Sequence, residues 1–284
     1  MKAPSFDYVR ATSTAEVFAL LQRHGDAARV LAGGQTLIAT LNMRLSEPAV
    51  LIDVGGLDAL RGITLAGGVL RIGALTTHAE IERSVLVADH LPLFAQAVPH
   101  IAHPAIRNRG TLGGSLAYAD PAAEWPACAL ALGATMVVAG ARGERRIAAD
   151  AFFTGLFTTA MASDELLVAC ELPVRAPDER HAFDELARRH GDYAIVGLAG
   201  RAVVRDGRLF DVRLAFLGVA DRPLRVPRTE QAVQGRTGDD ATLAVAVQTL
   251  RAELQPFGDL TNTPEMKRHL AGVLAQRVLR RLAT

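Results

Sequence analysis

Two glycine-containing loops are the segments of this sequence whose residue types best suit a phosphorylated ligand. Adjacent glycines let the backbone turn tightly and let a bulky anion approach peptide N–H groups without meeting a Cβ atom. Gly-Gly after a strand is often only a turn, so the argument depends on there being two such loops. The first loop consists of Ala32, Gly33, Gly34, Gln35, Thr36 and Leu37, and the second of Thr111, Leu112, Gly113, Gly114 and Ser115. Together they predict a diphosphate held from two sides.

Several familiar motifs of nucleotide binding and nucleophilic catalysis are absent from the sequence. No Gly-x-Gly-x-x-Gly follows the first predicted strand, and no Gly-Lys-Ser/Thr of a P-loop occurs. The Gly-x-Ser-x-Gly turn of serine hydrolases is also missing. The two loops therefore indicate a dinucleotide or a nucleoside diphosphate, and they leave flavin, nicotinamide and nucleotide-sugar ligands open.

Other polar residues have competing interpretations. Asp120 and Glu124 are four residues apart and could share a helix face; capping accounts for Asp120, whereas Glu124 could accept hydrogen bonds from sugar hydroxyls. Tyr193 is either a core aromatic or a ring packed against a ligand. His100 and His103 have a metal-like spacing, but no nearby carboxylate or thiol completes a site, so we interpret them as solvated loop residues.

The first glycine loop is positioned by alternating strands and helices. Ser13 and Glu16 form a capping box at the start of one helix, and Gly25 ends it. A second helix is expected over 36–44, directly after the loop. Strands are expected over 6–11, 29–32 and 51–54. This order predicts a small α/β lobe with parallel strands.

The second glycine loop lies in a segment of little regular pattern, 100–120. Thr77 with Glu80 predicts a capped helix before it, and a further helix is expected over 92–98. After the loop, a helix over 121–132 has Asp120 as its expected N-cap. Strands are expected over 69–73, 135–139, 146–148 and 166–172. Two prolines within 173–177 predict a domain boundary.

The remainder of the chain predicts an α+β domain, with strands first and helices after them. Asp206-Gly207 is a hairpin turn signal between two of the strands. Strands are expected over 181–188, 194–205 and 209–217, and helices over 229–234, 240–255 and 264–282.

Bulk composition narrows the classes of function. The chain has 284 residues, half of them apolar, and a net charge of +1, so nothing favours binding to nucleic acid or to an anionic membrane. Cys128 and Cys170 lie in apolar runs and are expected to be buried free thiols, which leaves no cysteine-ligated iron–sulfur cluster on this chain. No signal peptide and no apolar run of ~18 residues occurs, so a cytoplasmic protein is expected.

Three motifs together resemble one known family, the FAD-binding medium subunits of molybdenum hydroxylases of the carbon monoxide dehydrogenase and xanthine dehydrogenase type. The run Leu31-Ala32-Gly33-Gly34-Gln35-Thr36-Leu37 resembles the family's first pyrophosphate loop. The run from Ile106 to Glu124 resembles its second loop, and Ala187-Arg188-Arg189-His190-Gly191-Asp192-Tyr193-Ala194 resembles a later signature. The order and spacing of all three agree, from about Phe6 to the last helix.

The resemblance implies the fold and the domain limits. Residues 1–175 would form a vanillyl-alcohol-oxidase (PCMH)-type FAD-binding domain, with an α/β lobe over about 1–57 and a largely antiparallel lobe over 58–175. FAD would lie between these lobes. Residues 176–284 would form the family's C-terminal α+β domain, with a three-stranded antiparallel sheet and helices.

The resemblance also implies roles for individual residues. Both loops would hold the pyrophosphate of FAD through backbone N–H groups. Beyond the loops, the implied FAD-binding residues are Ile101, Asp120, Glu124, Leu167 and Tyr193. Tyr193 would lie beside the isoalloxazine, Leu167 would contact the ring system, and Glu124 would bind the sugar-like chain. Ile101 stands where the family can place an aromatic, and Asp184 stands where xanthine dehydrogenases have a basic flavin contact. No catalytic residue and no metal ligand is implied on this chain.

The implied reaction is electron transfer within a larger complex. A large subunit would hydroxylate the substrate at a molybdenum (molybdopterin) cofactor, and two 2Fe-2S clusters on a small subunit would deliver electrons to FAD. An external acceptor such as NAD or oxygen would remove them, and the assembly would be a dimer of heterotrimers. Two alternatives stay open: a self-sufficient FAD-dependent oxidase or reductase of the same fold, and a nucleotide-binding protein without redox activity.

Overall fold

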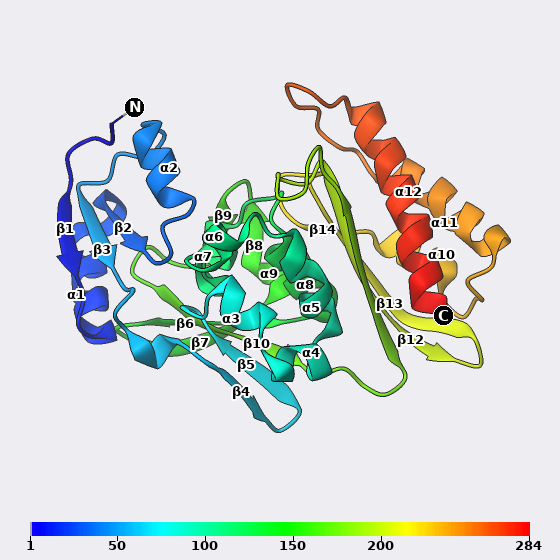
Figure 1. Ribbon diagram of the computed structural model, residues 1–284, viewed down its shortest axis with the longest axis horizontal. Coiled ribbons are helices and arrows are strands. Elements are labelled where there is room, and N and C mark those ends of the chain that lie inside the picture. The colour runs from blue at the N-terminus through cyan, green and yellow to red at the C-terminus, as the bar shows by residue number, and fades with distance from the viewer. Residues whose placement is uncertain (1) are drawn as a thin grey trace.

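The first lobe of the molecule is built around a parallel sheet of three strands in the order β1-β3-β2. The structure is a computed structural model that describes residues 2–284 (Figure 1). Ser13 caps the first helix by accepting from Glu16 N at 3.2 Å, while the Glu16 carboxylate accepts from Thr12 N at 2.8 Å. In the expected capping box, the Glu16 carboxylate would accept from the backbone N–H of Ser13; here it accepts from Thr12, one residue earlier. The elements are β1 (Asp7–Arg10), α1 (Thr14–His24), β2 (Ala28–Leu31), α2 (Leu37–Asn42) and β3 (Val50–Asp53).

The central lobe contains an antiparallel sheet of five strands in the order β4-β5-β10-β6-β7. A group of short helices stands over this sheet in Figure 1. Strand β4 was not anticipated from the sequence; it is a four-residue strand at the edge of the sheet, and its residues are mostly exposed. The strands are β4 (Ile63–Ala66), β5 (Val69–Gly73), β6 (Thr135–Gly140), β7 (Gly143–Ala148) and β10 (Leu166–Pro173), with a small hairpin of β8 (Phe153–Gly155) and β9 (Thr158–Thr159).

The helices of the central lobe differ from expectation around the second glycine loop. The segment 100–120 contains two short helices, and α8 begins at Glu124 with Ala123 as N-cap rather than at residue 121. Asp120 instead accepts from Ala122 N at 2.9 Å, so it stabilises the turn before the helix. The helices are α3 (His78–Glu82), α4 (Val85–His90), α5 (Pro92–Ala97), α6 (Pro104–Arg107), α7 (Leu112–Tyr118), α8 (Glu124–Leu132) and α9 (Ala149–Phe152).

The C-terminal domain is an antiparallel sheet of order β11-β12-β13-β14 with helices packed on it. The expected hairpin is confirmed: Asp206 and Gly207 both have positive φ, 49° and 69°, at the turn between β12 and β13. The two-residue strand β14 extends the expected sheet of three strands. The elements are β11 (Glu179–Leu186), β12 (Val196–Arg205), β13 (Arg208–Leu217), β14 (Leu224–Arg225), α10 (Pro227–Val233), α11 (Asp240–Glu253) and α12 (Pro264–Ala283).

The C-terminal sheet is covered by α12 on one face and by the central lobe on the other (Figure 1). Successive residues of β11 show both faces: Ala182 belongs to the core beneath α12, whereas Phe183 belongs to the core of the central lobe. Helix α8 contacts β12 and β13 on this second face. Across residues 2–284, no helix is both long enough and apolar enough to cross a membrane.

A tight contact between β12 and α12 provides a test of this packing. A Cβ atom at Gly200 would lie 2.7 Å from Val278 Cγ1. We expect Gly200→Ala to lower the free energy of unfolding by about 1–3 kcal/mol, because the core must shift to admit the methyl group. Val278→Ala opens space at the same point, so the double variant should lose less stability than the two single variants together. Urea unfolding measures all three; full additivity would contradict the contact.

Candidate functional site

The two glycine loops, far apart in sequence, lie against each other in the structure. A Cβ atom at Gly33 would overlap the carbonyl oxygen of Arg109 and approach Gly110 Cα to 2.9 Å. A Cβ atom at Gly114 would come within 4.0 Å of Ala32 Cβ. Only a residue without a side chain at Gly33 permits this approach, so the glycine joins the first lobe to the central lobe.

The first loop presents a series of free backbone donors. Gly34 has a φ of 72°, which turns the chain, and the Gln35 side chain closes the turn by donating to the Gly33 carbonyl at 3.0 Å. Within residues 2–284, no acceptor is found for the N–H groups of Gly33, Gly34, Gln35, Thr36 and Leu37. All five residues are partly exposed. Consecutive free N–H groups of this kind suit the oxygens of a diphosphate.

The second loop differs from the sequence-based expectation, because its backbone donors are already used. The hydrogen bonds run from Leu112 N to Thr76 O (3.0 Å), from Gly113 N to Ala74 O (2.8 Å), from Gly114 N to Thr111 Oγ1 (3.1 Å) and from Ser115 N to Thr111 O (3.1 Å). These bonds fix the loop to the central lobe instead of leaving it open to an anion. The loop therefore offers the half-buried Ser115 hydroxyl and the small surface at Gly114.

Tyr193 approaches the two loops from the C-terminal domain. It is 65% exposed, yet burial and the negative charge of Asp120 raise the pKa of its phenol, and the neighbouring Thr36 side chain acts in the opposite direction. Tyr118 and Glu124 contribute further to the raised pKa. The side chain is thus largely open to solvent, with Thr36 of the first lobe and Asp120 of the central lobe among the groups near it. We call residues 32–37, 109–120 and 187–193 the loop junction.

Glu124 is a buried carboxyl group next to this junction. It is 8% exposed, and burial, followed by the charges of Glu185 and Asp120, raises its pKa to about 8. At neutral pH the side chain is a neutral carboxylic acid that can both donate and accept hydrogen bonds. The sequence predicted that Glu124 accepts hydrogen bonds from hydroxyl groups of a ligand. The protonated carboxyl group can also donate a hydrogen bond to the ligand.

The sequence did not point to Glu185, the neighbour of Asp184, which stands where xanthine dehydrogenases have a basic flavin contact. The Asp184 carboxylate faces α12, where Arg277 Nη1 lies 3.6 Å from its Oδ2 atom. The Glu185 side chain is only 4% exposed, and it influences Glu124 across the boundary between the central lobe and the C-terminal sheet. The strand alternation of β11 was the available signal, since adjacent residues of a strand point to opposite faces.

Ile101 and Leu167 lie in the core of the central lobe. They are 8% and 3% exposed, and they share that core with Leu112 and Leu116 of α7. The structure therefore places both residues behind the second loop, where their apolar side chains support it.

His78 and Trp125 form a second support that the sequence did not reveal. Trp125 Nε1 donates to His78 Nδ1 at 3.0 Å, and the imidazole packs beneath Gly110. Burial, and then the charge of Arg107, lowers the pKa of His78 to about 4, so the ring is neutral. Arg107 itself binds Glu82 and the Ile101 carbonyl. These buried polar groups hold the backbone of the second loop in place.

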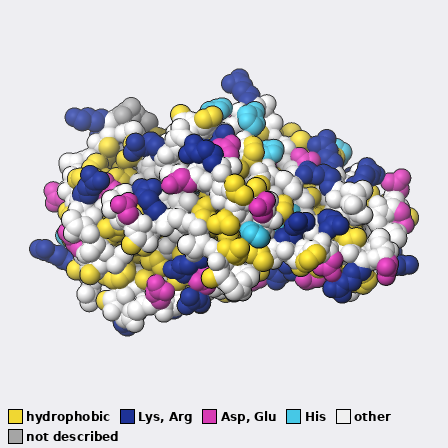
Figure 2. Space-filling view, turned by 60° about the horizontal axis from the view of Figure 1, so that its bottom comes forward, with side chains coloured by type: hydrophobic (Ala, Val, Ile, Leu, Met, Phe, Trp, Pro, Cys, Tyr) yellow, Lys and Arg dark blue, Asp and Glu magenta, His cyan; other side chains and the backbone are white. Residues whose placement is uncertain are grey.

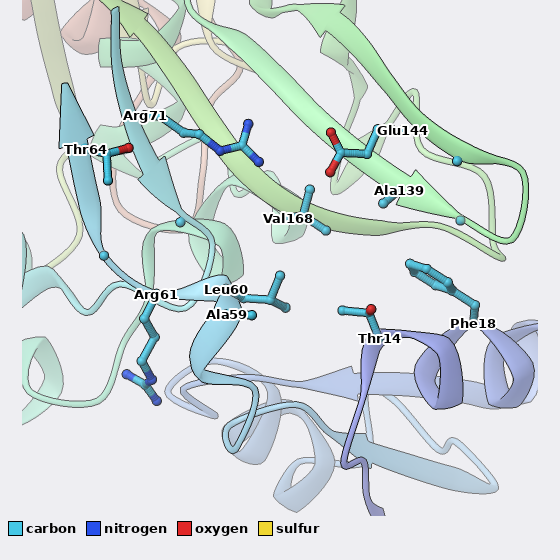
Figure 3. Close-up of a pocket in the computed structure, with 14 residues that line it drawn as sticks. Thr14, Phe18, Ala59, Leu60, Arg61, Thr64, Arg71, Ala139, Glu144 and Val168 are labelled. Atoms are coloured by element: carbon cyan, nitrogen blue, oxygen red, sulfur yellow. The ribbon is translucent and has the colours of Figure 1, made fainter. Parts of the chain in front are cut away.

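A large cavity of the described chain lies apart from the loop junction. A space of about 510 Å³ separates α1 from the five-stranded sheet, with Thr14 and Phe18 on one side and Arg71 on the other (Figure 3). Arg71 is paired with Glu171 at 2.7 Å, so its charge is compensated. The cavity lies between the first lobe and the central lobe, and both arginines that line it, Arg61 and Arg71, have acidic partners.

The chain carries no large field of one sign on the face shown in Figure 2, where basic and acidic side chains are interspersed. Cys128 and Cys170 are buried free thiols, as expected. Among residues 2–284, no group of three or more His, Cys, Asp or Glu side chains could hold a metal ion.

Comparison with known proteins defines the class of this fold and site. Residues 4–175 match the model of the FAD-binding domain in molybdopterin dehydrogenase, and residues 181–282 match that of the CO dehydrogenase flavoprotein C-terminal domain. The structure of carbon monoxide dehydrogenase from Hydrogenophaga pseudoflava superposes with a TM-score of 0.96 at 34% identity, covering 99% of this chain and 98% of the other. The structure of quinoline 2-oxidoreductase from Pseudomonas putida 86 superposes with a TM-score of 0.94 at 37% identity, covering 100% of this chain and 98% of the other. The molecule is an FAD-binding flavoprotein.

Curated relatives match over nearly their whole length. The chain is 37% identical to caffeine dehydrogenase subunit beta from Pseudomonas sp. (strain CBB1), covering 100% of this chain and 96% of the relative. It is also 37% identical to the nicotine 6-hydroxylase medium subunit of Paenarthrobacter nicotinovorans, covering 98% of each. The chain belongs to the family of FAD-binding medium subunits of molybdenum hydroxylases. This confirms the resemblance of the three motifs and identifies an oxidoreductase subunit.

The contact at Gly33 can be tested directly. We expect Gly33→Ala to push the two loops apart and to weaken FAD binding by about tenfold or more, which corresponds to about 1.4 kcal/mol. FAD content and affinity can be measured by flavin absorbance and fluorescence. Gly67→Ala is the control: a Cβ atom there meets nothing within 4 Å, and its φ of 57° adds a backbone strain that Gly33→Ala does not have, so it tests strain without a steric clash. Equal FAD retention by the two variants would contradict the role of Gly33.

The pKa of Glu124 predicts a pH-dependent stability. The folded chain keeps a proton on this group up to about pH 8, whereas the unfolded chain releases it near 4.5. The folded state thus binds more protons in this window, and stability falls as pH rises through it, by at most about 1.4 kcal/mol per pH unit. We expect Glu124→Gln to remove this decline, so its stability relative to wild type should increase between these pH values. A constant difference across the window, measured by urea unfolding without FAD, would contradict the pKa.

Proposed function

We propose that this chain is the electron-exit subunit of a three-subunit molybdenum hydroxylase. Its FAD would accept electrons from 2Fe-2S clusters on a small partner subunit and deliver them to NAD, oxygen or another external acceptor. FAD supplies the chemistry for this position, because it exchanges electrons singly or in pairs. The observation that carries the proposal is the junction of the two glycine loops with Tyr193, since it gathers phosphate donors and an aromatic ring from all three parts of the chain.

We assign separate tasks to the residues of the loop junction. The free N–H groups of 33–37 hold the pyrophosphate, and Ser115 with Gly114 faces it from the second loop. Glu124 binds the hydroxyl-bearing chain of FAD, and Tyr193 packs beside its ring system. Asp120 orders the turn that leads to Glu124, while Ile101 and Leu167 support the second loop from the core. None of these residues forms an acid–base pair for substrate chemistry, which agrees with a relay function.

Substrate selection would belong to the large partner subunit with its molybdenum cofactor. Relatives of this chain are named for caffeine, nicotine and carbon monoxide, yet each is matched over nearly its entire length at 33–37% identity. These substrates are chemically unrelated, yet the relatives share one medium-chain architecture. This supports the proposal that the substrate is selected by another subunit of the complex. We further propose domain limits at 1–175 and 176–284, a cytoplasmic location that fits the free thiols, and a dimer of heterotrimers.

Isolation of the native complex tests the proposal. A tagged copy of this chain should purify with two further polypeptides, and with about one FAD, four iron atoms and one molybdenum atom per copy, as two 2Fe-2S clusters require. FAD without metals or partners would instead establish a self-sufficient flavoenzyme. A protein that folds without flavin would refute the assignment.

Tyr193 provides a test within the chain. We expect Tyr193→Ala to retain FAD but to change the flavin absorption spectrum and the rate of reoxidation by the external acceptor, because the ring loses its aromatic neighbour. Stopped-flow absorbance measures both properties. Phe257→Ala is the matched control, since Phe257 has a similar exposure, 64% against 65%, and does not belong to the loop junction. An unchanged spectrum with unchanged reoxidation would remove Tyr193 from the site.

A further inference from the structure

Ala102, in the turn before α6, has a backbone conformation that residues with a side chain rarely adopt. Its φ is 46°, in the left-handed region. The Ala102 carbonyl oxygen accepts from Arg107 Nη1 at 3.2 Å, and the Ile101 carbonyl oxygen accepts from the same atom at 3.1 Å. A strained residue of this kind persists only where its surroundings fix it, and such residues gather at functional sites.

Arg107 holds this turn from the interior. The residue is 8% exposed, and its Nε and Nη2 atoms donate to the two carboxylate oxygens of Glu82 at 3.0 and 3.1 Å. A bidentate pair fixes the plane of the guanidinium group, so Nη1 is left to bind the two carbonyls of the turn. Arg107 is also the last residue of α6, which leads into the second glycine loop. The turn and that loop therefore share one anchor.

The loop that carries Tyr193 rests on this turn at Gly191. Gly191 has a φ of 87°, and a Cβ atom there would lie 2.5 Å from His103 Cε1, 2.7 Å from His103 Nδ1 and 3.1 Å from the Ala102 carbonyl oxygen. Only a residue without a side chain can approach the turn so closely. Because Tyr193 follows two residues later, the contact at Gly191 fixes the point from which its side chain extends.

His100 makes a second contact with the same loop. Its ring centroid lies 6.4 Å from that of His190, in an edge-on arrangement, and 5.3 Å from that of Phe183 in β11. The spacing of His100 and His103 resembled that of metal ligands in the sequence. In the structure both imidazoles instead meet the segment that leads to Tyr193.

The loop has little else to hold it against the central lobe. Its own hydrogen bonds run from Asp192 N to Arg189 O at 3.1 Å and, across its base, from Ile195 N to Leu186 O at 2.8 Å. Within residues 2–284, the backbone of 187–193 makes no hydrogen bond to the central lobe. Packing against 100–103, rather than hydrogen bonding of the backbone, therefore holds the loop in place.

We propose that residues 100–103 form a seat that fixes the loop 187–193 and thereby holds the Tyr193 ring at the loop junction. Ala102, His103 and Arg107 are positioning residues, because they act through Tyr193. A fixed ring gives the flavin one constant neighbour, whereas a displaced ring leaves water in its place. The position of Tyr193 beside the flavin rests on the proposed function, while the seat belongs to the chain alone.

Gly191→Ala tests the seat, because it places a methyl group between the loop and the turn. We expect the amide hydrogens of 187–195 to exchange about tenfold faster or more, since the loop loses its support. FAD should be retained, and its absorption spectrum and reoxidation rate should change in the same direction as in Tyr193→Ala. Hydrogen exchange with mass spectrometry and stopped-flow absorbance measure these properties on the isolated complex.

Gly207→Ala is the matched control, at the hairpin turn of the same domain. Gly207 also has a positive φ, 69°, but a Cβ atom there meets nothing within 4 Å. This variant introduces backbone strain without a steric clash. It should leave the exchange of 187–195 and the flavin spectrum unchanged.

A second substitution separates the contact from a general loss of folding. His103→Ala removes the two imidazole atoms nearest to the added methyl group, and the His103 side chain makes no capping hydrogen bond to α6. The double variant Gly191→Ala/His103→Ala should therefore exchange more slowly over 187–195 than Gly191→Ala alone, and its flavin spectrum should move back toward that of the wild type.

The exchange measurement decides on the seat, whatever is bound at the junction. Wild-type exchange of 187–195 in Gly191→Ala, equal acceleration in Gly207→Ala, or a double variant without any recovery would overturn the inference. Faster exchange in Gly191→Ala with an unchanged flavin spectrum and unchanged reoxidation would leave the seat standing. That last result would instead refute the proposed position of Tyr193 beside the flavin.

Discussion

The close approach of Gly33 to the Arg109 carbonyl is the constraint on which the loop junction depends. The first loop ends a strand of the parallel sheet, whereas the second is fixed to the central lobe by its own backbone hydrogen bonds. Because no side chain separates them at this point, the backbone of the first loop, with its free N–H groups, lies directly against that of the second. Every ligand contact that we assign requires the two lobes to meet in this way.

Two buried titratable side chains behind the junction are uncharged at neutral pH. His78 is held neutral by burial while it accepts from Trp125, and Glu124 keeps its proton for the same reason. Neutral polar groups can order a loop without the desolvation cost of a buried ion. The exception is the Oε2 atom of Glu185, which is buried without a hydrogen-bond partner in the described part of the chain.

The C-terminal domain contributes to the site from one face of its sheet only. Strand β11 places Ala182 and Asp184 toward α12 and places Phe183 and Glu185 toward the central lobe. The loop after this strand carries Tyr193 to the junction. Strand β11 thereby buries an acid against the central lobe and leads into the loop that carries Tyr193, while β12 and β13 add contacts with α8.

The sequence by itself determined the local features: the capped helices, the Asp206-Gly207 hairpin and the two glycine loops, because each depends on residues close together in the chain. Its motifs also identified the family. Tertiary structure alone decided which backbone donors stay free, since the N–H groups of the second loop are used by Ala74 and Thr76 from a distant segment. It also decided that Glu185, rather than Asp184, influences Glu124: strand alternation puts the two residues on opposite faces, but only the packing of the domains shows which face meets the central lobe.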